Sequence, residues 1–444
     1  MRRFVSFLAL AAFSASLVFT PGRAWAGESE MMEALLHKLV EKGVLSNEEA
    51  WEVRKEVAEE AAKNVKSRAE EIKDVAKGMK GGSWLDKVKW SGDLRLRHET
   101  QRRQPAVNRN RERFRLRFGF VANPIDPLEI GVQLASGAAG DPTSTNQSFT
   151  DTFDKKPIFI DKAYGKYTPW KGGSGPLAGL NLIGGKMDNP FVTIPEGITW
   201  DGDVTPEGVA MKWKSPSPWF ESLLSIAPFI NIGGFAVEEI SGDHGDPGLF
   251  GYQGGADIKL LGGWNFQPSA AYYNFTGIKG IATSHITAAT AGNSASGGRF
   301  LSDYNLLNVT GQLTHKDILF GHPVAFLADY THNEDNRALS SLDDPNVDDD
   351  GAYTAGVQIG KVTEKFGSWQ LFGFRKRIET DSTFGAIADS DFGGGGTNHK
   401  GWIMGGSLGL NKYASIVLKY IRTDEIEGTQ NRFDTLQADL QLKY

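Results

Sequence analysis

The chain has 444 residues, of which 53 are glycine, 11% are aromatic and none is cysteine, and its formal net charge is −6. The lack of cysteine excludes a fold held together by disulfides, and the negative charge, with no nucleic-acid-binding motif, argues against nucleic acid as a partner. A mean hydropathy of −0.33 in a glycine-rich and aromatic-rich chain is typical of a β-rich protein that is too polar for a bundle of membrane-spanning helices.

The N-terminus has the pattern of a secretory signal peptide. Arg2 and Arg3 precede an apolar run over residues 4–19, and small residues flank Trp25 just before Gly27. The run is too short for a spanning helix, so residues 1–26 are predicted to be a signal peptide that is removed on export.

Residues 27–83 are predicted to form a periplasmic helical segment and a linker. A first helix over residues 30–42 ends at Gly43, and Ser46 with Glu49 forms a capping box for a second helix. Apolar residues then recur at spacings of three and four, which indicates a thin coiled-coil seam. The seam is Ala58, Ala61, Val65, Arg68, Ile72, Val75 and Met79. The segment is either a stalk that reinforces oligomerisation or a solvated helix.

From residue 84 to residue 444 the pattern changes to period-two alternation, which is typical of strands with one apolar and one polar face. The last strand is the clearest case, because Leu436, Leu440 and Leu442 alternate with polar residues up to Tyr444. Strands are predicted near 90–98, 111–120, 128–136, 158–167, 180–187, 204–214, 223–237, 251–261, 265–277, 303–315, 323–332, 351–362, 368–378, 400–410, 414–425 and 435–444. Merging or splitting of weak strands would give fourteen or eighteen.

Short connections take turns with long polar ones along this region, and aromatic residues gather at the predicted strand ends. A soluble β-sandwich would show the alternation of side chains but has no reason for alternating loop lengths. The predicted fold is therefore an all-β transmembrane barrel of about 16 antiparallel strands, preceded by the short α-helical segment.

Nine arginines lie between Arg95 and Arg117, the sharpest charge asymmetry of the chain. Because side chains alternate, those of each strand share one face, which must be the lumen since an arginine in lipid at mid-depth costs roughly 2–4 kcal/mol. The predicted pore-lining, anion-attracting ladder is Arg95, Arg97, Arg111, Arg113, Arg115 and Arg117. It either favours anions or is balanced by carboxylates across the pore. The candidate balancing groups are Glu129, Asp257, Asp329 and Asp439.

The loop over residues 188–203 is the candidate constriction of the pore, with Asp188, Glu196, Asp201 and Asp203 as its carboxylates. It could instead be an ordinary external loop, with the longer loop over residues 137–157 folding inward.

No metal or catalytic site is predicted. The acidic residues between Asp343 and Asp350 do not have the spacing of a calcium-binding loop, and the eight histidines show no metal-ligand spacing. No nucleophile motif of the GxSxG type is present.

Three segments resemble a known family. They are KWSGDLRLRHE (89–99), RERFRLRFGF (111–120) and GGKMDNPF (184–191). Together with the signal peptide and the helical segment they make the chain similar to the family of putative outer-membrane porins of Gram-negative bacteria, and similar in layout to phosphate-selective porins. The resemblance implies a homotrimer of sixteen-stranded barrels whose loop after the fifth strand narrows each pore. The chain departs from the pattern in ending on Tyr444 where a terminal Phe is usual.

The function predicted is passive diffusion of small hydrophilic solutes across the outer membrane, with an anion bias from the arginine ladder and no cofactor. Outer-membrane lipid, small hydrophilic or anionic solutes and, through the helical segment, peptidoglycan or a periplasmic protein are the predicted partners. Two alternatives stay open: a barrel enzyme such as a phospholipase or protease, and a structural tether of the envelope with an incidental channel.

Overall fold

The computed structural model describes residues 87–444 except 174, 221–223, 242–244, 287–290, 336–349 and 430, together with a few isolated positions between 40 and 55. The predicted signal peptide lies outside the described residues, and so does the predicted helical segment apart from those isolated positions. Within the described part of the chain, no helix is long and apolar enough to cross a membrane.

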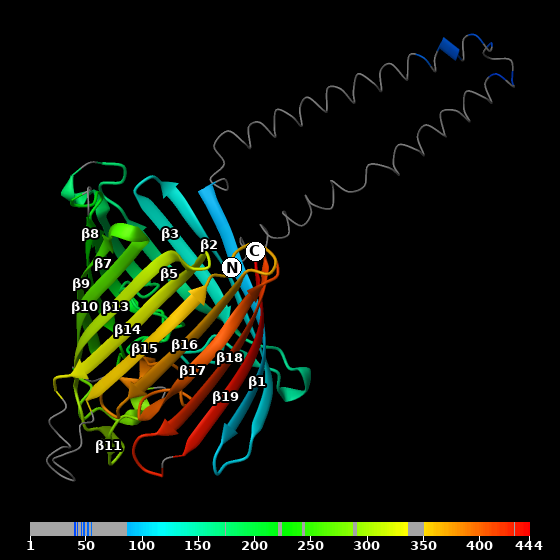
Figure 1. Ribbon diagram of the computed structural model, residues 1–444. Helices are drawn as coiled ribbons and strands as arrows, with labels where there is room; N and C mark the ends of the chain where they lie inside the picture. The colour runs from blue at the N-terminus through cyan, green and yellow to red at the C-terminus, as the bar shows by residue number, and fades with distance from the viewer. Residues whose placement is uncertain are drawn as a thin grey trace. The chain divides into compact units, whose positions relative to one another are not determined.

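In the described residues sixteen antiparallel strands close into a barrel, because β1 pairs with β2 on one side and with the last strand, β19, on the other (Figure 1). The barrel strands are β1 (Val88–Arg103), β2 (Arg109–Ile125), β3 (Leu128–Ser136), β5 (Ile158–Tyr167), β6 (Leu180–Lys186), β7 (Glu207–Lys214), β8 (Ser225–Ala236), β9 (Gly248–Lys259), β10 (Trp264–Thr276), β13 (Tyr304–Leu319), β14 (His322–Asn333), β15 (Gly351–Gly360), β16 (Trp369–Ile378), β17 (His399–Gly409), β18 (Ala414–Glu425) and β19 (Arg432–Lys443). Three short strands lie in loops: β4 (Gln147–Ser148) beside β2, and β11 (Ala295–Ser296) paired with β12 (Arg299–Phe300).

The predicted sixteen-stranded barrel is confirmed, and the alternatives of fourteen or eighteen strands are wrong. β3, β5 and β18 have the limits expected from alternation, whereas β1 continues from residue 98 to Arg103. The extension of β1 is polar on both faces, so it carries no alternation, yet it stays paired with β19 as far as Arg103. Pairing with a neighbouring strand, which no local pattern reveals, sets this strand end.

The two faces of the strands have different surroundings. On β18, Leu418 is exposed on the outer surface, while Lys419 and Ile421 point to the inside and are covered. On β2, Leu116 and Phe118 are exposed, and Arg115 and Arg117, which alternate with them, contact residues inside the barrel. The sandwich interpretation, which requires a sealed apolar interior between two sheets, is therefore wrong.

The inner surface is nevertheless not uniformly polar. One group of buried apolar side chains joins Ile198 to Phe374, Phe392 and Ile403, and a second surrounds Tyr273. These groups form where loops that turn into the barrel pack against its wall. Apolar residues on inward positions therefore mark the anchoring surfaces of loops.

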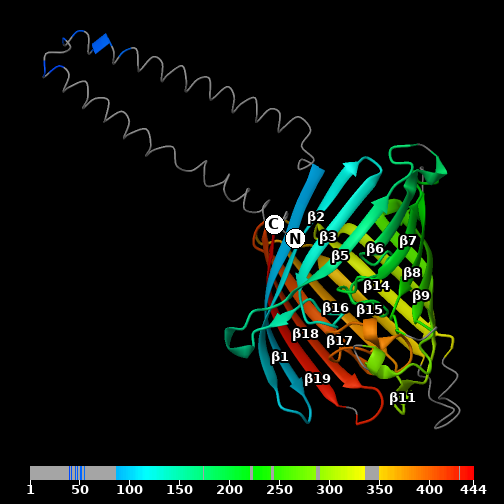
Figure 2. The ribbon, with the colours of Figure 1, turned by 180° about the vertical axis from the view of Figure 1, so that it is seen from behind.

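The strands β6 and β7 are shorter than the neighbouring β5, so the wall of the barrel has a low section at these two strands (Figure 2). β6 pairs with β5 only from Ala163 onward, so the edge of β5 over residues 158–162 has β3 as its only described strand partner. The chain leaves β6 at Lys186 and returns to β7 at Glu207. Residues 187–206 turn inward at this point.

We predict that an arginine on the outer face destabilises the barrel far more than one on the inner face. Gly406 of β17 is opposite Leu418 and Ser407 is opposite Val417, so Leu418 and Ser407 lie at nearly the same depth on opposite faces. Leu418→Arg is expected to lower the free energy of unfolding in lipid vesicles by about 2–4 kcal/mol. Ser407→Arg is the control, and it is expected to lower the free energy of unfolding by less, because its charge enters water. An equal decrease in the two variants would contradict the assignment of faces.

Candidate functional site

Residues 187–206, here called the first inward loop, cross the inside of the barrel. The backbone N–H of Val192 donates to Gln253 on β9 at 2.7 Å, and that of Ile198 donates to Asp329 on β14 at 3.0 Å. The carbonyl of Gly197 accepts from Lys376 Nζ on β16 at 2.8 Å. The loop is thus held by strands on several sides of the lumen. That it forms the constriction of the pore stays a prediction.

The four carboxylates predicted for this loop have different partners. Asp203 contacts Arg117 and accepts from the backbone N–H of Thr145, whereas Glu196 lies 2.7 Å from Lys419 on β18. Asp201 accepts from the backbone N–H of Ser390, and Asp188 pairs with Lys162 on β5 away from the arginines. Among the four, only Asp203 contacts the arginine ladder in the described structure.

The six predicted arginines come together on adjacent strands. The register places Arg95 opposite Arg115 and Arg97 opposite Arg113, so like charges are direct cross-strand neighbours. Such pairs destabilise a sheet unless other groups offset them. The ladder is therefore possible only with counter-charges close by.

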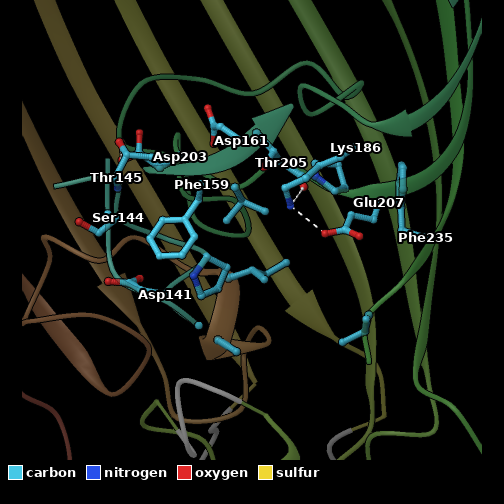
Figure 3. A pocket seen from close by; sticks show the side chains of 18 of the residues that line it. Asp141, Ser144, Thr145, Phe159, Asp161, Lys186, Asp203, Thr205, Glu207 and Phe235 are labelled. Atoms are coloured by element: carbon cyan, nitrogen blue, oxygen red, sulfur yellow. Dashed lines mark hydrogen bonds and ion pairs between the residues drawn. The ribbon is translucent and has the colours of Figure 1, made fainter. Parts of the chain in front are cut away.

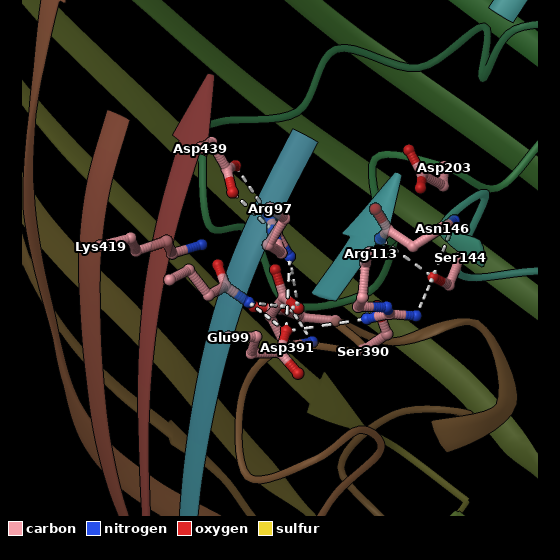
Figure 4. Close-up of polar contacts among 12 residues, drawn as sticks. Arg97, Glu99, Arg113, Ser144, Asn146, Asp203, Ser390, Asp391, Lys419 and Asp439 are labelled. Carbon is pink, nitrogen blue, oxygen red and sulfur yellow. Dashed lines mark hydrogen bonds and ion pairs between the residues drawn. The ribbon is translucent and has the colours of Figure 1, made fainter. Parts of the chain in front are cut away.

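Five carboxylates supply these counter-charges. Figure 4 labels Glu99, Asp203, Asp391 and Asp439, and the fifth is Asp93. Glu99 is fully buried and lies 3.7 Å from Arg113. Asp439 accepts two hydrogen bonds from Arg97, at 2.8 and 2.9 Å. The contacts of the ladder are Arg95 with Asp439, Arg97 with Asp439, Glu99 and Asp391, Arg111 and Arg113 with Glu99, Arg115 with Asp93, and Arg117 with Asp203.

Of the four balancing groups suggested by the sequence, only Asp439 contacts the ladder. Glu129 pairs with Lys166, Asp257 pairs with Lys214, and Asp329 accepts from the first inward loop. Glu99 was not predicted as a balancing group, although it lies within 4 Å of Arg97, Arg111 and Arg113. Its position on the same face as Arg95 and Arg97 was the available signal.

A second inward loop, residues 379–398 between β16 and β17, was not predicted. Its residues Asp381, Phe384 and Phe392 are 0–1% exposed although they belong to a connection between strands. Lys376 Nζ donates to Asp389 of this loop at 2.8 Å as well as to Gly197 of the first. One fully buried lysine thus joins the two inward loops.

The longer connection over residues 137–157 is divided between inside and outside. Ser144, Thr145 and Asn146 are buried, and all three accept hydrogen bonds from ladder arginines. Phe153 is fully exposed, on the stretch that projects from the barrel (Figure 1). Both connections that the sequence offered as alternatives therefore contribute residues to the inside.

The three inward segments divide the lumen into cavities. One of about 570 Å³ is lined by aromatic side chains such as Phe159 and Phe235 and by charged groups such as Asp161 and Lys186 (Figure 3). Two others, of about 400 and 500 Å³, lie against the ladder. They are separated where Ser390 donates to the carbonyl of Thr143 at 3.0 Å.

Burial, together with the neighbouring charges of Asp389 and Asp203, raises the pKa of Asp201 to about 8. Asp201 is therefore mostly protonated at neutral pH. In contrast, the nearby Arg117 and the N–H of Thr145 lower the pKa of Asp203 against the effect of burial, so that Asp203 carries its charge. The first inward loop thus presents one charged and one mostly neutral carboxyl side by side.

Among the described residues no cluster of His, Asp and Glu has a geometry suited to a metal ion. The acidic residues 343–349 lie outside the described part of the chain.

A closed sixteen-stranded barrel with an apolar outer surface and charged loops inside defines a channel-forming protein of the outer membrane. The family described as "Putative porin" matches residues 103–298 and 294–444, so the chain belongs to this porin family. No curated protein matches the chain.

Solved porin structures are similar in fold. The high-pH structure of Pseudomonas putida OprB has a TM-score of 0.51 at 11% identity, over 82% of this chain and 97% of that one. A Salmonella typhi OmpF complex with daunomycin has a TM-score of 0.46 at 11% identity, over 80% and 97%. Similarity to phosphate-selective porins is not among these findings.

We predict that ion selectivity changes with pH around 8 through Asp201. Raising the pH from 7 to 9 converts Asp201 from mostly protonated to mostly charged and adds a negative charge beside Asp203, which favours cations. Asp201→Asn keeps the neutral form at both pH values, so the change should be largely lost. Reversal potentials of reconstituted protein in a salt gradient measure this; an identical pH response in Asp201→Asn and wild type would contradict the prediction.

Proposed function

We propose that this protein is a passive diffusion channel for small hydrophilic solutes, with a modest preference for anions. The observation that carries the proposal is the arginine ladder on the inner wall: six guanidinium groups are contacted by five carboxylates, namely Asp93, Glu99, Asp203, Asp391 and Asp439. The difference of 6 − 5 = +1 leaves a small positive excess on this wall. In a narrow aqueous passage such an excess raises the local concentration of anions.

The pairing of the ladder indicates how it acts on anions. The Nε atoms of Arg95, Arg113 and Arg117 are buried without a hydrogen-bond partner in the described structure, so they are not open to a passing anion. The ladder therefore acts on solutes through its charge. Because a carboxylate already contacts each arginine, the arrangement favours general anion attraction over a dedicated phosphate site.

The low wall beside β5 supports assembly into the trimer that the family resemblance implies. Ile158 and Ile160 are 59% and 62% exposed on an edge whose backbone has no described partner on the β6 side. Open sheet edges do not persist in contact with hydrocarbon, since unpaired N–H and C=O groups are costly there. A neighbouring barrel would cover this edge. Contact of residues 27–83 with peptidoglycan or a periplasmic protein stays a prediction.

The selectivity proposal is tested by planar-bilayer recording in a gradient of potassium chloride. The wild type is expected to conduct, and the sign of its reversal potential is expected to indicate a higher permeability for chloride than for potassium. Changing Arg113, Arg115 and Arg117 together to Gln should move it to the cation side, because three positive charges leave while the carboxylates stay. The matched control changes Arg375, Arg377 and Arg422 to Gln; they alternate with the inward Phe374, Lys376 and Ile421, so selectivity should not change.

Absence of any conductance would contradict the channel itself. Cation preference in the wild type would contradict only the anion bias.

The trimer is tested by the mass of the purified protein in detergent, measured by light scattering. Ile160→Lys is expected to yield monomers, because a charge at the covered edge of β5 cannot be buried between barrels without a partner. Tyr330→Lys, on the outer face of β14, should keep the wild-type mass. A wild-type monomer, or trimers in both variants, would contradict the proposed interface.

A further inference from the structure

The second inward loop carries two carboxylates at its tip, and one of them reaches the arginine ladder. Asp391 Oδ1 lies 3.5 Å from Arg97 Nη1 and accepts a hydrogen bond from Gln437 Nε2 of β19 at 2.9 Å. Asp389 instead pairs with Lys376 on β16. Asp391 is thus the only described counter-charge that this loop, rather than the strands or the first inward loop, supplies to the ladder.

Asp391 lies at the partition between the two cavities that border the ladder. It lines the cavity of about 400 Å³ together with Arg111 and Arg113, and it also lines the cavity of about 500 Å³ together with Arg95 and Lys419. The other four carboxylates of the ladder do not line both cavities. A solute that passes through either cavity therefore passes Asp391.

The tip of the second inward loop is held in place from two sides. The backbone N–H of Ser390 donates to Asp201 of the first inward loop at 2.8 Å, and Ser390 Oγ donates to Thr143 at 3.0 Å. The neighbouring Asp389 is fixed by the fully buried Lys376. These contacts set the position of Asp391 relative to Arg97.

Directly after the tip, residues 393–396 are four glycines with φ between 69° and 106°. A Cβ on Gly396 would lie 1.9 Å from the carbonyl oxygen of Ala291, so this position accepts no side chain. Gly394, Gly395 and Gly396 line the smaller cavity together with Arg111 and Arg113. The turn thus brings Asp391 to the ladder without filling the space beside it.

We propose that Asp391 is a specificity-determining residue of the channel, which offsets the arginine ladder at the partition of the two cavities and so limits the preference for anions over cations. This inference rests on the proposed function as a channel. It assigns the selectivity to a balance between wall and loop: the wall supplies the positive charges, and the second inward loop sets how many of them act on a solute.

The first test compares permeability ratios of chloride and potassium in planar bilayers for the full chain. Asp391→Asn removes the charge and keeps a side chain of the same shape whose oxygen can still accept from Gln437. The ratio is expected to rise by up to about 25-fold, because one unit charge at about 4 Å in water changes the local concentrations of chloride and of potassium by about fivefold each, in opposite directions. The control Asp257→Asn removes the same charge from the inner wall away from both cavities and should leave the ratio unchanged.

A conducting Asp391→Asn channel with the wild-type ratio, or an equal rise in Asp257→Asn, overturns the inference while leaving the channel function intact. Absence of conductance in the wild type overturns the channel function itself.

A second test uses the natural absence of cysteine. Ser390→Cys places one thiol at the same tip, where both cavities are lined by this residue. Modification by a sulfonate-bearing thiol reagent should lower the chloride preference, and modification by a trimethylammonium reagent should raise it. If neither reagent changes the current of a folded, conducting channel, the tip does not lie on the conduction path and the inference fails.

Discussion

Closure of the sheet between β1 and β19 is the constraint on which the rest of the structure depends. No backbone polar group can stay unpaired in hydrocarbon, so the first and last strands must meet. Their register places Arg97 opposite Asp439, and these residues form a bidentate pair although 342 positions separate them in the chain. The same pairing that completes the barrel therefore supplies the first counter-charge of the arginine ladder.

The loops inside the barrel follow from the same requirement for partners. Cross-strand arginines on β1 and β2 repel each other, and the strands alone provide Asp93, Glu99 and Asp439 against six of them. Asp203 and Asp391 arrive on the two inward loops. These loops in turn need apolar anchors, which explains why Phe374 and Ile403 occupy inward positions of a barrel whose interior is otherwise polar.

The sequence predicts the barrel well because alternation is a local property, and it predicts which arginines share a face for the same reason. Partners are not local, so Glu129, Asp257 and Asp329 were reasonable candidates for balancing the ladder and pair elsewhere. The second inward loop was missed although residues 379–398 combine five glycines with Phe384 and Phe392. Aromatic residues in a glycine-rich connection are a signal that such a segment packs against something rather than facing water.

A row of arginines in a porin sequence is therefore weak evidence of selectivity by itself. Guanidinium groups this close need carboxylates nearby, and each one that arrives removes part of the field that would attract anions. What a solute meets depends on which carboxylates lie beside the passage and which are hidden behind it. Glu99 is fully buried, whereas the side chain of Asp391 is 27% exposed. Two carboxylates of equal charge can thus have different roles: Glu99 stabilises the wall, and Asp391 faces the solute.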